Sequence, residues 1–511
     1  MQTDISTSLN LDATVGVVIQ YAQKKDVIID KDAAIFLSKQ EDYKTVIDSA
    51  FKDKVPFLDL KKAEEILQKL SSSVEIVFEK KADISNLEVV VENRAKRREA
   101  KEYTSKMKII KDTDITNNTT GQGKVTDFVE FVRDRYNILS GLIKKHNNFS
   151  PVQSSGIKYS AKGVEVDVIG MVYEKRDTKT GNLMVIFDDN NGFFTAIFDK
   201  NKPIYAQARK LLNDDVVGIK GVKLDEKLIY ASEIIFPDMP VATPKKSDID
   251  LDIVFTSDAH IGSNVFFEKE FNNFIDWLDK GEDSSKIKYC VIAGDGVDGI
   301  GVYPGQDEEL AVKDIYKQYE ILSNYIERIP EHIETFIIPG NHDAVRRADP
   351  QPAIPKEYLK KLYGLKNVHV LGSPSMVEIE GLKMLMYHGN SMNELQAKLG
   401  IHFEDPIPVM EAYLLRRDVC TIYGGKNPVS PDKGGVLQIK EEPDIFVTGH
   451  LHSNGYGTYK KTMLINPGAW QAQTSFQKQQ GHIPTPGRVP VMNMKTGKIL
   501  EKVFINEVAN M

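Results

Sequence analysis

The chain has 511 residues, of which 41% are hydrophobic and 27% charged, with a formal net charge of -7. At about 150 residues per domain this length predicts roughly three domains, and the negative charge excludes a protein that coats nucleic acid by bulk electrostatics. The sequence lacks both the roughly 20 consecutive apolar residues of a membrane span and an N-terminal signal pattern, so we expect a cytoplasmic protein that makes no membrane contact.

The N-terminal part is expected to form a small helical domain over residues 1–75. Its segments ATVGVVIQYAQKK and LDLKKAEEILQKL repeat apolar residues at helical spacing. Residues 76–150 are predicted to be a linker and a connecting helix, because a charged and polar stretch ends in TNNTTGQGK and the helix-like VTDFVEFVRDRYNILSGLIKK follows it. The basic residues between Arg94 and Lys101 are interpreted as part of this solvated linker.

Residues 155–240 are predicted to form an OB-fold β-barrel. Five short β-like runs lie between Val164 and Phe236, and the helical segment IYAQARKLLND separates the third run from the fourth. OB-folds often hold single strands on aromatic side chains, although we expect most of the aromatic residues here to fill the barrel core. The aromatic candidates are Tyr173, Phe187, Phe193, Phe194 and Phe198. The proline- and lysine-containing PVATPKKSD then predicts an interdomain linker.

Residues 248–511 are expected to form an α/β domain with polar clusters at the ends of its strands. Five apolar β-like runs each end in a short motif, and together the motifs contribute Asp258, His260, Asp295, Asp298, Asn341, His342, His388, His450 and His452. Side chains that alternate at the end of a strand can point at a common ligand. Because five of the chain's 10 histidines lie in these motifs, packing alone does not explain the pattern. The sequence therefore predicts a metal site.

The mixture of ligand types indicates the metal and its chemistry. Imidazole nitrogens combined with carboxylate and amide oxygens suit Mn²⁺, Fe²⁺ or Zn²⁺ better than Ca²⁺. The motifs hold more ligands than one ion needs, so we expect two ions about 3.5–4 Å apart, bridged by one carboxylate and by a hydroxide that attacks phosphorus. His342, beside Asn341, has no evident ligand role and is predicted to stabilise the transition state or to protonate the leaving oxygen. These residues alone predict a phosphoester hydrolase.

The motif order D-x-H, GD-x-x-D, GNHD, His-Gly and GH-x-H resembles the calcineurin-like metallophosphoesterase superfamily. The resemblance implies a two-sheet α/β sandwich and assigns the ligands to two ions. One ion would be held by Asp258, His260 and His452, the other by Asn341, His388 and His450, and Asp295 would bridge them. Asp298 would act behind these ligands, orienting one of them or His342.

The whole chain is similar, more narrowly, to the small subunits of archaeal family-D DNA polymerases. The segments GNHDAVRRADPQPAI, IYGGKNPVSPD and NPGAWQAQTSFQKQQGHIPTPGRVPV carry this resemblance. It implies a proofreading 3′–5′ exonuclease that uses two divalent ions, with Mn²⁺ expected first, and that acts on the single-stranded or frayed 3′ end of DNA. It also implies a separate large polymerase subunit as the partner.

Several residues near the motifs bear on the substrate. The superfamily's protein phosphatases usually read GNHE and have an arginine where this chain has Gly299, so GNHD and Gly299 favour nucleic acid. The residues predicted to grip DNA phosphates are Arg346, Arg347 and Gln351, with a salt-bridged surface loop as the equal alternative. Trp470 and Phe476 are predicted either to stack on a terminal base or to pack against the large subunit, and packing against the subunit is favoured.

Two other functions stay open from the sequence. One is a non-catalytic scaffold that binds the polymerase large subunit, and the other is a metallophosphoesterase acting on a phosphomonoester or a cyclic nucleotide. The complete set of ligand positions favours a working nuclease over the scaffold. Direct contact with a sliding clamp is also open, since the C-terminal EKVFINEVANM lacks the aromatic pair that is usual in clamp-binding peptides.

Overall fold

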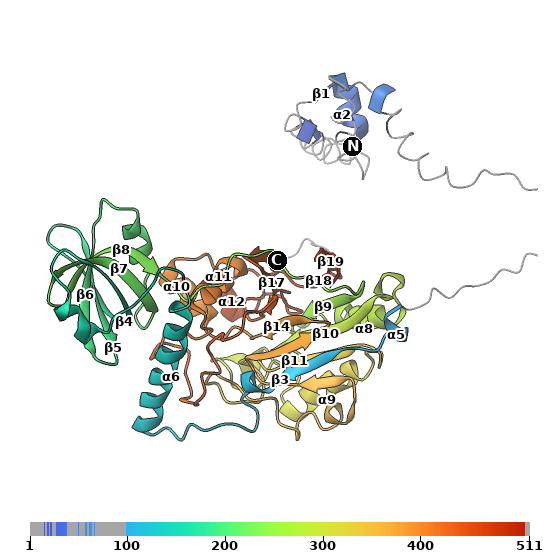
Figure 1. Cartoon of the computed structure of the whole chain (residues 1–511). Coiled ribbons are helices and arrows are strands. Elements are labelled where there is room, and N and C mark those ends of the chain that lie inside the picture. The colour runs from blue at the N-terminus through green and yellow to red at the C-terminus, as the bar shows by residue number, and fades with distance from the viewer. Residues whose placement is uncertain are drawn as a thin grey trace, which may run out of the picture. The chain divides into compact units, whose positions relative to one another are not determined.

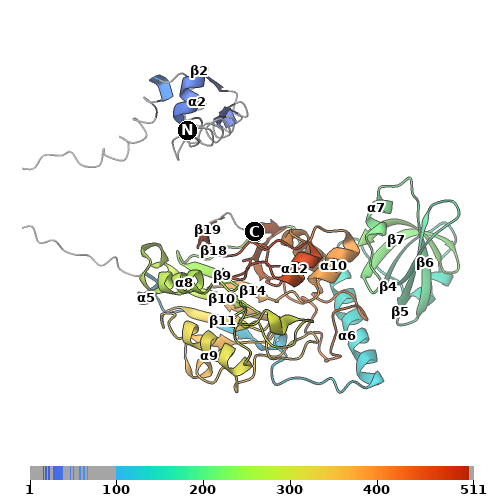
Figure 2. The ribbon, with the colours of Figure 1, turned by 180° about the vertical axis from the view of Figure 1, so that it is seen from behind.

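The computed structural model describes residues 99–505 continuously, together with residues 15, 18–19, 21–22, 27–37, 47, 50, 57–58, 61–63 and 66. The chain forms two compact units, Met1–Asn93 and Arg94–Met511 (Figures 1 and 2). In the part that the structure describes, no helix has both the length and the apolar character needed to cross a membrane.

In the N-terminal unit, one short helix packs with a pair of strands. Helix α2 (Lys31–Leu37) buries one face, and β1 (Ile28–Ile29) pairs in parallel with β2 (Phe57–Leu58). The sequence predicted only helices for residues 1–75, so this strand pair is a feature that it did not predict. The β-like SSSVEIVFEKK, most of both expected amphipathic helices, and residues 94–98 of the basic stretch lie outside the described residues.

The second unit contains two six-stranded sheets. The first has the spatial order β12 (Val368–Val370), β11 (Glu334–Ile338), β10 (Ile287–Ala293), β9 (Asp252–Thr256), β18 (Arg488–Asn493) and β19 (Ile499–Val503). The second has the order β16 (Gly455–Tyr459), β17 (Thr462–Asn466), β15 (Ile445–Val447), β14 (Leu382–Met386), β13 (Ser375–Ile379) and β3 (Met107–Ile110). The sequence predicted a multidomain α+β protein, and the structure is mixed α/β, with these two sheets and a closed barrel.

The two sheets pack face to face, with helices on their outer sides. Alternate residues of β10 show this: Tyr289 and Val291 belong to the core between the sheets, whereas Cys290 and Ile292 belong to the core under the helices. That outer core includes one face of α8 (Glu268–Lys280) and of α9 (Ile315–Ile326). On the far side, α10 (Met392–Leu399) and α11 (Pro406–Arg416) cover the second sheet.

Strand β3 lies in a segment that the sequence predicted to be linker. Met107–Ile110 pairs antiparallel with β13 and forms the edge of the second sheet. Tyr103 and Tyr289 both donate their hydroxyls to Glu380, at 2.8 and 2.6 Å, which fastens this segment to both sheets. The linker prediction for these residues was wrong, because a run of only four residues, Met-Lys-Ile-Ile, among charged neighbours carries too weak a pattern to reveal an edge strand. Short helix α5 (Glu99–Glu102) precedes β3.

The barrel contains the five strands that the sequence predicted. Its closed order is β4 (Glu165–Asp177), β5 (Leu183–Asp189), β6 (Gly192–Phe198), β8 (Leu228–Ile235) and β7 (Val216–Asp225), and α7 (Ile204–Arg209) lies between β6 and β7. Of the aromatic candidates, Phe187, Phe194 and Phe198 are buried in the barrel core. Tyr173 and Phe193 are 60% and 46% exposed and form an edge-to-face pair.

Helix α6 (Val125–Ile143) and two buried arginines join the barrel to the sheets. Phe131 of α6 packs in the core under α11, and Leu139 packs against the barrel. Arg135 donates to Asp418 beyond α11 and to a backbone carbonyl of the barrel. Arg416, at the end of α11, donates to Asp215, which is 1% exposed. Both arginines cross between the two parts, so they fix the barrel's orientation.

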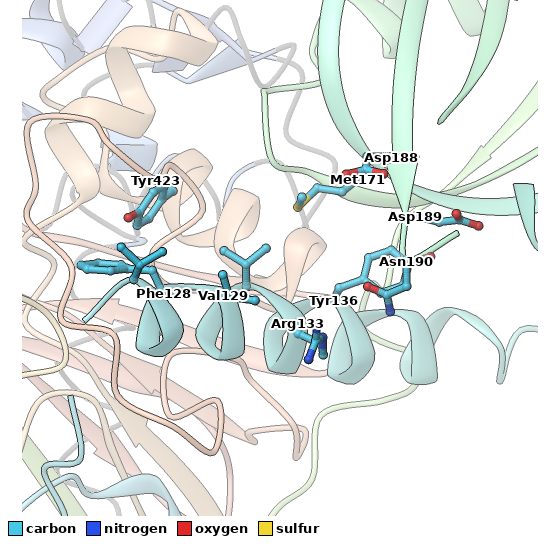
Figure 3. A pocket seen from close by; sticks show the side chains of 11 residues that line it. Phe128, Val129, Arg133, Tyr136, Met171, Asp188, Asp189, Asn190 and Tyr423 are labelled. Atoms are coloured by element: carbon cyan, nitrogen blue, oxygen red, sulfur yellow. The ribbon is translucent and has the colours of Figure 1, made fainter. Parts of the chain in front are cut away.

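A cavity of about 440 Å³ lies beside this junction (Figure 3). Apolar side chains of α6 form its floor, including Phe128 and Val129, while Tyr423 and the barrel residues Met171 and Asp188 close its sides. None of the residues that line it belongs to the five polar motifs. The cavity is therefore separate from the metal site predicted from the sequence.

We expect Arg416→Met to destabilise the protein by about 3–5 kcal/mol, because it leaves the buried Asp215 carboxylate without its counter-charge. Arg209→Met is the matched control, since Arg209 pairs with Asp177 on the same barrel but both side chains are at least half exposed, and such pairs contribute less than about 1 kcal/mol. Urea denaturation of both variants measures the difference. Equal losses in the two variants would contradict the proposed role of Arg416.

Candidate metal centre

The five polar motifs meet at one edge of the stacked sheets. Strands β9, β10 and β11 run parallel in the first sheet, and β14 and β15 run parallel in the second. Each of these strands is followed within a few residues by one motif. Because the carboxyl ends of parallel strands lie at the same edge, motifs separated by up to 190 or so positions converge there.

The backbone at this edge adopts an unusual conformation. Asp258, His260, Asp295, His450 and His452 all have positive φ angles, between 49° and 68°. Residues with a Cβ rarely occupy this left-handed region, and each such residue costs on the order of 1–3 kcal/mol. Strain of this kind persists only where the surrounding structure enforces it, and it is concentrated at functional sites.

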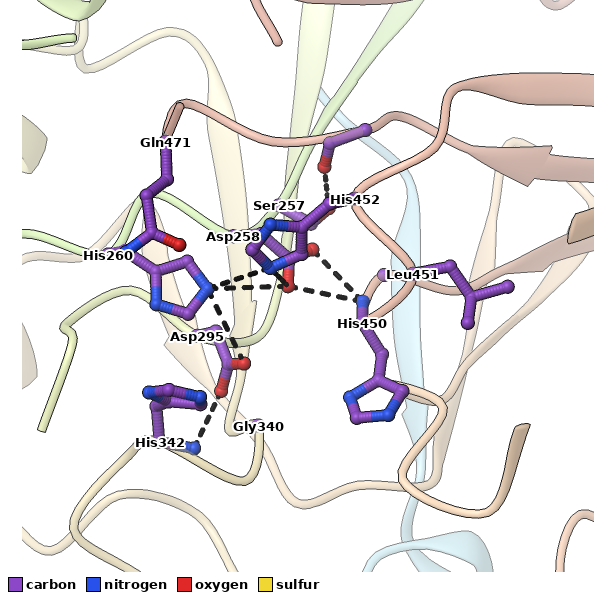
Figure 4. A network of polar contacts seen from close by, with 12 residues as sticks. Ser257, Asp258, His260, Asp295, Gly340, His342, His450, Leu451, His452 and Gln471 are labelled. Carbon is purple, nitrogen blue, oxygen red and sulfur yellow. Dashed lines mark hydrogen bonds and ion pairs between the residues drawn. The ribbon is translucent and has the colours of Figure 1, made fainter. Parts of the chain in front are cut away.

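The first cluster contains Asp258, His260 and His452, with one ligand atom of each within 4.8 Å of the others. The Nε2 atoms of His260 and His452 lie 2.9 Å apart, and His452 Nε2 is 3.4 Å from Asp258 Oδ1 (Figure 4). Two imidazole nitrogens and a carboxylate oxygen thus point into one small volume. This arrangement matches three ligands of a single cation.

The second cluster contains Asp295, His388 and His450. His388 donates from Nδ1 to the carbonyl of Ala293 at 2.7 Å, which leaves Nε2 directed at Asp295 Oδ2, 3.1 Å away. This Nε2 is fully buried, and in the neutral ring no donor among the described residues faces its lone pair, whereas in the charged ring its proton would point at Asp295. His450 Nδ1 lies 2.8 Å from Asn341 Oδ1, so the amide oxygen joins the same group. A buried lone pair without a donor is what a metal ligand would present.

Asp295 and His260 connect the two clusters. Together with His342 they form a third group within the same 4.8 Å limit. Asp295 Oδ1 accepts from the backbone N–H of His342 at 2.8 Å, while Oδ2 faces His388 and, at 3.8 Å, His260. Asp295 therefore lies between the two clusters, as a bridging carboxylate would.

Asp298 lies behind the first cluster. Its Oδ1 accepts from Nδ1 of His260 at 2.8 Å, which turns Nε2 of that ring toward the cluster. Gln471 and Gln306 donate to its two carboxylate oxygens at 3.1 and 3.0 Å, so the carboxylate is fixed on both sides. Gln477 lies 2.9 Å from His452 Nδ1 and holds that ring in the same way. Sequence reasoning did not identify these three glutamines, because no spacing pattern connects them to their partners, which lie 8, 173 and 25 positions away for Gln306, Gln471 and Gln477.

The protonation equilibria of the buried groups show what charge the site attracts. Burial opposes the charged form of His260 and His388, but neighbouring carboxylates raise their pKa values to about 10 and about 9. Burial and the nearby His388 lower the pKa of His450 to about 3. Burial would raise the pKa values of Asp258 and Asp295, yet the surrounding imidazoles hold both below the usual range. The carboxylates stay ionised and require positive charge beside them.

The positive charge would lie at Nε2 of His260 and of His388. Each Nδ1 of His260 and His388 donates to the protein, so the additional proton of the charged ring would occupy Nε2, inside the clusters. A divalent cation at the same place would satisfy the carboxylates with less crowding and would give Nε2 of His388 a partner. The two clusters therefore have the ligand atoms and the negative charge that bound divalent cations require.

Glycines give the ligands room to approach one another. A Cβ at Gly294, whose φ is +94°, would overlap the His388 ring, and a Cβ at Gly340 would overlap Asp295 Oδ1. At Gly299, whose φ is +72°, a Cβ would overlap the carbonyl oxygen of His342. This backbone constraint excludes an arginine there whatever the substrate, so Gly299 no longer distinguishes nucleic acid from phosphoprotein.

The three residues predicted to contact DNA differ in exposure. Arg346 is held by Asp432 and by the carbonyl of Pro350. Gln351 is fully buried and donates to the carbonyls of Gly340 and Arg346, so it supports the loop and does not reach a surface. Arg347 is exposed and donates to the carbonyls of Gly301 and Val302. Of the three, Arg347 is the most exposed, whereas the side chain of Arg346 is 25% exposed and engaged by Asp432.

The two aromatic candidates near the C-terminus have different surroundings. Trp470 is 2% exposed, packs on Phe271 and Phe274, and donates from Nε1 to Thr256. It is a core residue of this chain, so the prediction that Trp470 stacks on a base or packs against a large subunit was wrong. Phe476, on α12 (Ser475–Gln480), is 43% exposed and stacks on Tyr303. Phe476 lies at the rim of the site.

Comparisons with known proteins agree on one family. Residues 253–457 match the family of the B-subunits of DNA polymerases alpha and epsilon. A protein of Archaeoglobus fulgidus named DNA polymerase II small subunit is 41% identical over 414 residues, covering 78% of this chain and 81% of that protein. The equally named proteins of Methanocaldococcus jannaschii and Methanothermobacter thermautotrophicus are 39% and 37% identical, covering 79% and 76% of this chain and 69% and 82% of their own lengths.

One solved structure, described as a novel archaeal phosphodiesterase, is 17% identical with a TM-score of 0.26. The match covers 50% of this chain and 99% of that chain. A TM-score of this size does not establish a shared fold.

We expect Gly340→Ala to weaken Mn²⁺ binding at least about 10-fold, because the added methyl group displaces Asp295 from between the clusters. Isothermal titration with MnCl₂ measures the affinity. Gly141→Ala is the control, since a Cβ at Gly141 of α6 meets no atom within 4 Å. Unchanged affinity in Gly340→Ala would show that Asp295 is not a ligand.

Proposed function

Because the chain belongs to the family of archaeal DNA polymerase II small subunits, we propose that it is the proofreading 3′–5′ exonuclease subunit of a heterodimeric replicative DNA polymerase. The observation that carries the proposal is the convergence of carboxylate and imidazole atoms in three groups, of which the middle one shares His260 with the first and Asp295 with the third. A subunit that only bridged other proteins would have no need of buried, strained and mutually crowded ligands.

In the proposed site, two divalent ions occupy the two clusters, and Mn²⁺ is the first choice, with Fe²⁺ or Zn²⁺ also suited to the ligands. Asp258, His260 and His452 would hold one ion and Asn341, His388 and His450 would hold the other, with Asp295 placed between the two groups. When bound, the ions supply an activated water and neutralise charge that develops on the phosphodiester. Asp298 fixes the His260 ring for this purpose.

His342 is the proposed catalytic side chain. The backbone N–H of His342 donates to Asp295, and its Nδ1 donates to the carbonyl of Asp298 at 2.7 Å. These two contacts fix the backbone of His342 and one nitrogen of its ring. Nε2 is the ring nitrogen left for the substrate, and the ring lies edge-on to His260 with centroids 4.5 Å apart. Burial lowers the pKa of His342, and the negative charge of a bound phosphodiester would favour its imidazolium form. In that form Nε2 carries the proton with which His342 would stabilise the phosphorane or protonate the leaving oxygen.

The finer fold and domain assignments form part of the proposal. We assign residues 155–240 to an OB-fold and residues 248–511, together with β3, to a calcineurin-like phosphodiesterase domain. The five-stranded barrel with a helix before β7 supports the first assignment, and the paired six-stranded sheets support the second. The exposed Tyr173 and Phe193 would then offer a single strand an aromatic surface.

The proposed partner is a large polymerase subunit, because the relatives carry the name of a small subunit. The proposed substrate is the single-stranded or frayed 3′ end of DNA, and Arg347 is an exposed cation beside the site.

Contact with a sliding clamp is a further proposal, and the C-terminal residues 506–511 that bear on it lie outside the described residues.

Incubating the chain with Mn²⁺ and a 5′-labelled single strand should give a ladder of shortened products on a denaturing gel, and EDTA should abolish it. His342→Ala should slow the cleavage by about 10²- to 10⁴-fold, the usual contribution of a positioned acid or hydrogen-bond donor. His146→Ala, which changes an exposed histidine in the loop after α6, should leave the rate unchanged.

Three results would count against the exonuclease. The absence of any ladder would favour the scaffold, and an unchanged ladder in His342→Ala would point to a contaminating nuclease. Faster turnover of a phosphomonoester or a cyclic nucleotide than of DNA would favour another phosphoesterase.

The tagged chain, purified from its native cells, should retain a large polymerase subunit in a near 1:1 ratio. Mass spectrometry identifies the partner, and gel filtration measures the ratio. Recovery of the chain alone, at a protein concentration above micromolar, would contradict the assignment as a polymerase subunit.

A further inference from the structure

We propose that Tyr303 and Phe476 form an aromatic wall on which the 3′-terminal base of the strand stacks, thereby positioning the last phosphodiester at the metal clusters. The inference rests on the proposed exonuclease function and adds a base-binding surface to it. Tyr303 lies in the loop after the GD-x-x-D motif, and Phe476 lies in α12, 173 positions further along the chain.

The two rings stack on each other next to the catalytic side chain, so a base would add to this stack at the exposed part of Phe476. Their centroids are 5.3 Å apart with an interplanar angle of 27°, and the Tyr303 centroid lies 6.1 Å from that of His342. A base on this surface would be connected through a single sugar to a phosphate beside His342. This proximity distinguishes the wall from the exposed Tyr173–Phe193 pair of the barrel.

The protein holds the wall in place with one carboxylate. Glu309 accepts from the Tyr303 hydroxyl at 2.8 Å and, with its other oxygen, from the backbone N–H of Ser475 at 2.9 Å. Thr474 and Gln477 cap the same helix reciprocally, and Gln477 also contacts His452. Both rings are therefore fixed relative to the clusters before a substrate arrives, which lowers the entropic cost of binding.

Exposure and charge favour a nucleotide as the occupant. Phe476 remains 43% exposed although it stacks on Tyr303, so part of the ring is available to a ligand. Arg347 donates to Gly301 and Val302 in the loop that carries Tyr303, which adds an exposed cation beside the two rings. An aromatic face with an adjacent guanidinium suits a base and its phosphate, and it suits every base because all have a π-face.

The test compares a strand ending in a normal 3′ nucleotide with one ending in a 3′ abasic nucleotide. Phe476→Leu should raise KM for the normal strand by about 5- to 100-fold, the range for losing one base–aromatic stack, and should leave KM for the abasic strand unchanged. Phe476→Trp keeps an aromatic ring and should retain the wild-type preference. Phe403→Leu, which removes an equally exposed ring in the loop after α10, should not alter the preference.

A second measurement needs no catalysis. In EDTA, a 2-aminopurine at the 3′ end should lose fluorescence on binding the wild-type chain, and Phe476→Leu should reduce that quenching. A KM increase of equal size on both strands, with quenching retained, would overturn the wall. If the wild-type chain hydrolyses neither strand, the exonuclease proposal fails, and the fluorescence result alone then supports or overturns the wall.

Discussion

Three buried carboxylates, those of Asp258, Asp295 and Asp298, lie within reach of five imidazole rings, and their negative charge must be balanced inside the protein. Taking a carboxylate out of water costs several kcal/mol unless a cation compensates it. The pKa values respond to this demand, since those of the acids fall and those of His260 and His388 rise. The rest of the site serves to bring these charges together and to leave space for cations between them.

The fold meets this demand through parallel strands and strained turns. Strands β9, β10 and β11 deliver their motifs to one edge, and β14 and β15 of the second sheet deliver theirs opposite. The left-handed backbone at the ligands and the missing side chains at Gly294 and Gly340 allow the rings and carboxylates to approach. The four layers of helix, sheet, sheet and helix supply the buried apolar area that offsets the strain.

Much of the site could be predicted from the sequence, because ligands follow apolar strands at short, fixed spacings. The barrel strands were equally visible, since their alternation is regular. Strand β3 was missed because four residues carry little pattern and their partner, β13, lies some 270 positions away. Gln306, Gln471 and Gln477 were missed for the same reason: each acts through a contact that only the folded chain creates.

Residues close to a motif proved harder to interpret than the motif itself. Gln351 follows GNHD by eight positions but is buried under it, and Arg346 is engaged by Asp432, 86 positions later. Sequence proximity does not indicate which way a loop residue points. Gly299 was interpreted as a sign of the substrate, but a side chain at this position would overlap the carbonyl oxygen of His342. The backbone therefore explains why the residue is a glycine.

The central claim is that the two clusters hold two cations with Asp295 between them. Anomalous X-ray scattering at the manganese edge, from crystals grown with Mn²⁺, tests it most directly. The account predicts two peaks about 3.5–4 Å apart, one among Asp258, His260 and His452 and the other among Asn341, His388 and His450. A single peak, or peaks at other residues, would contradict it.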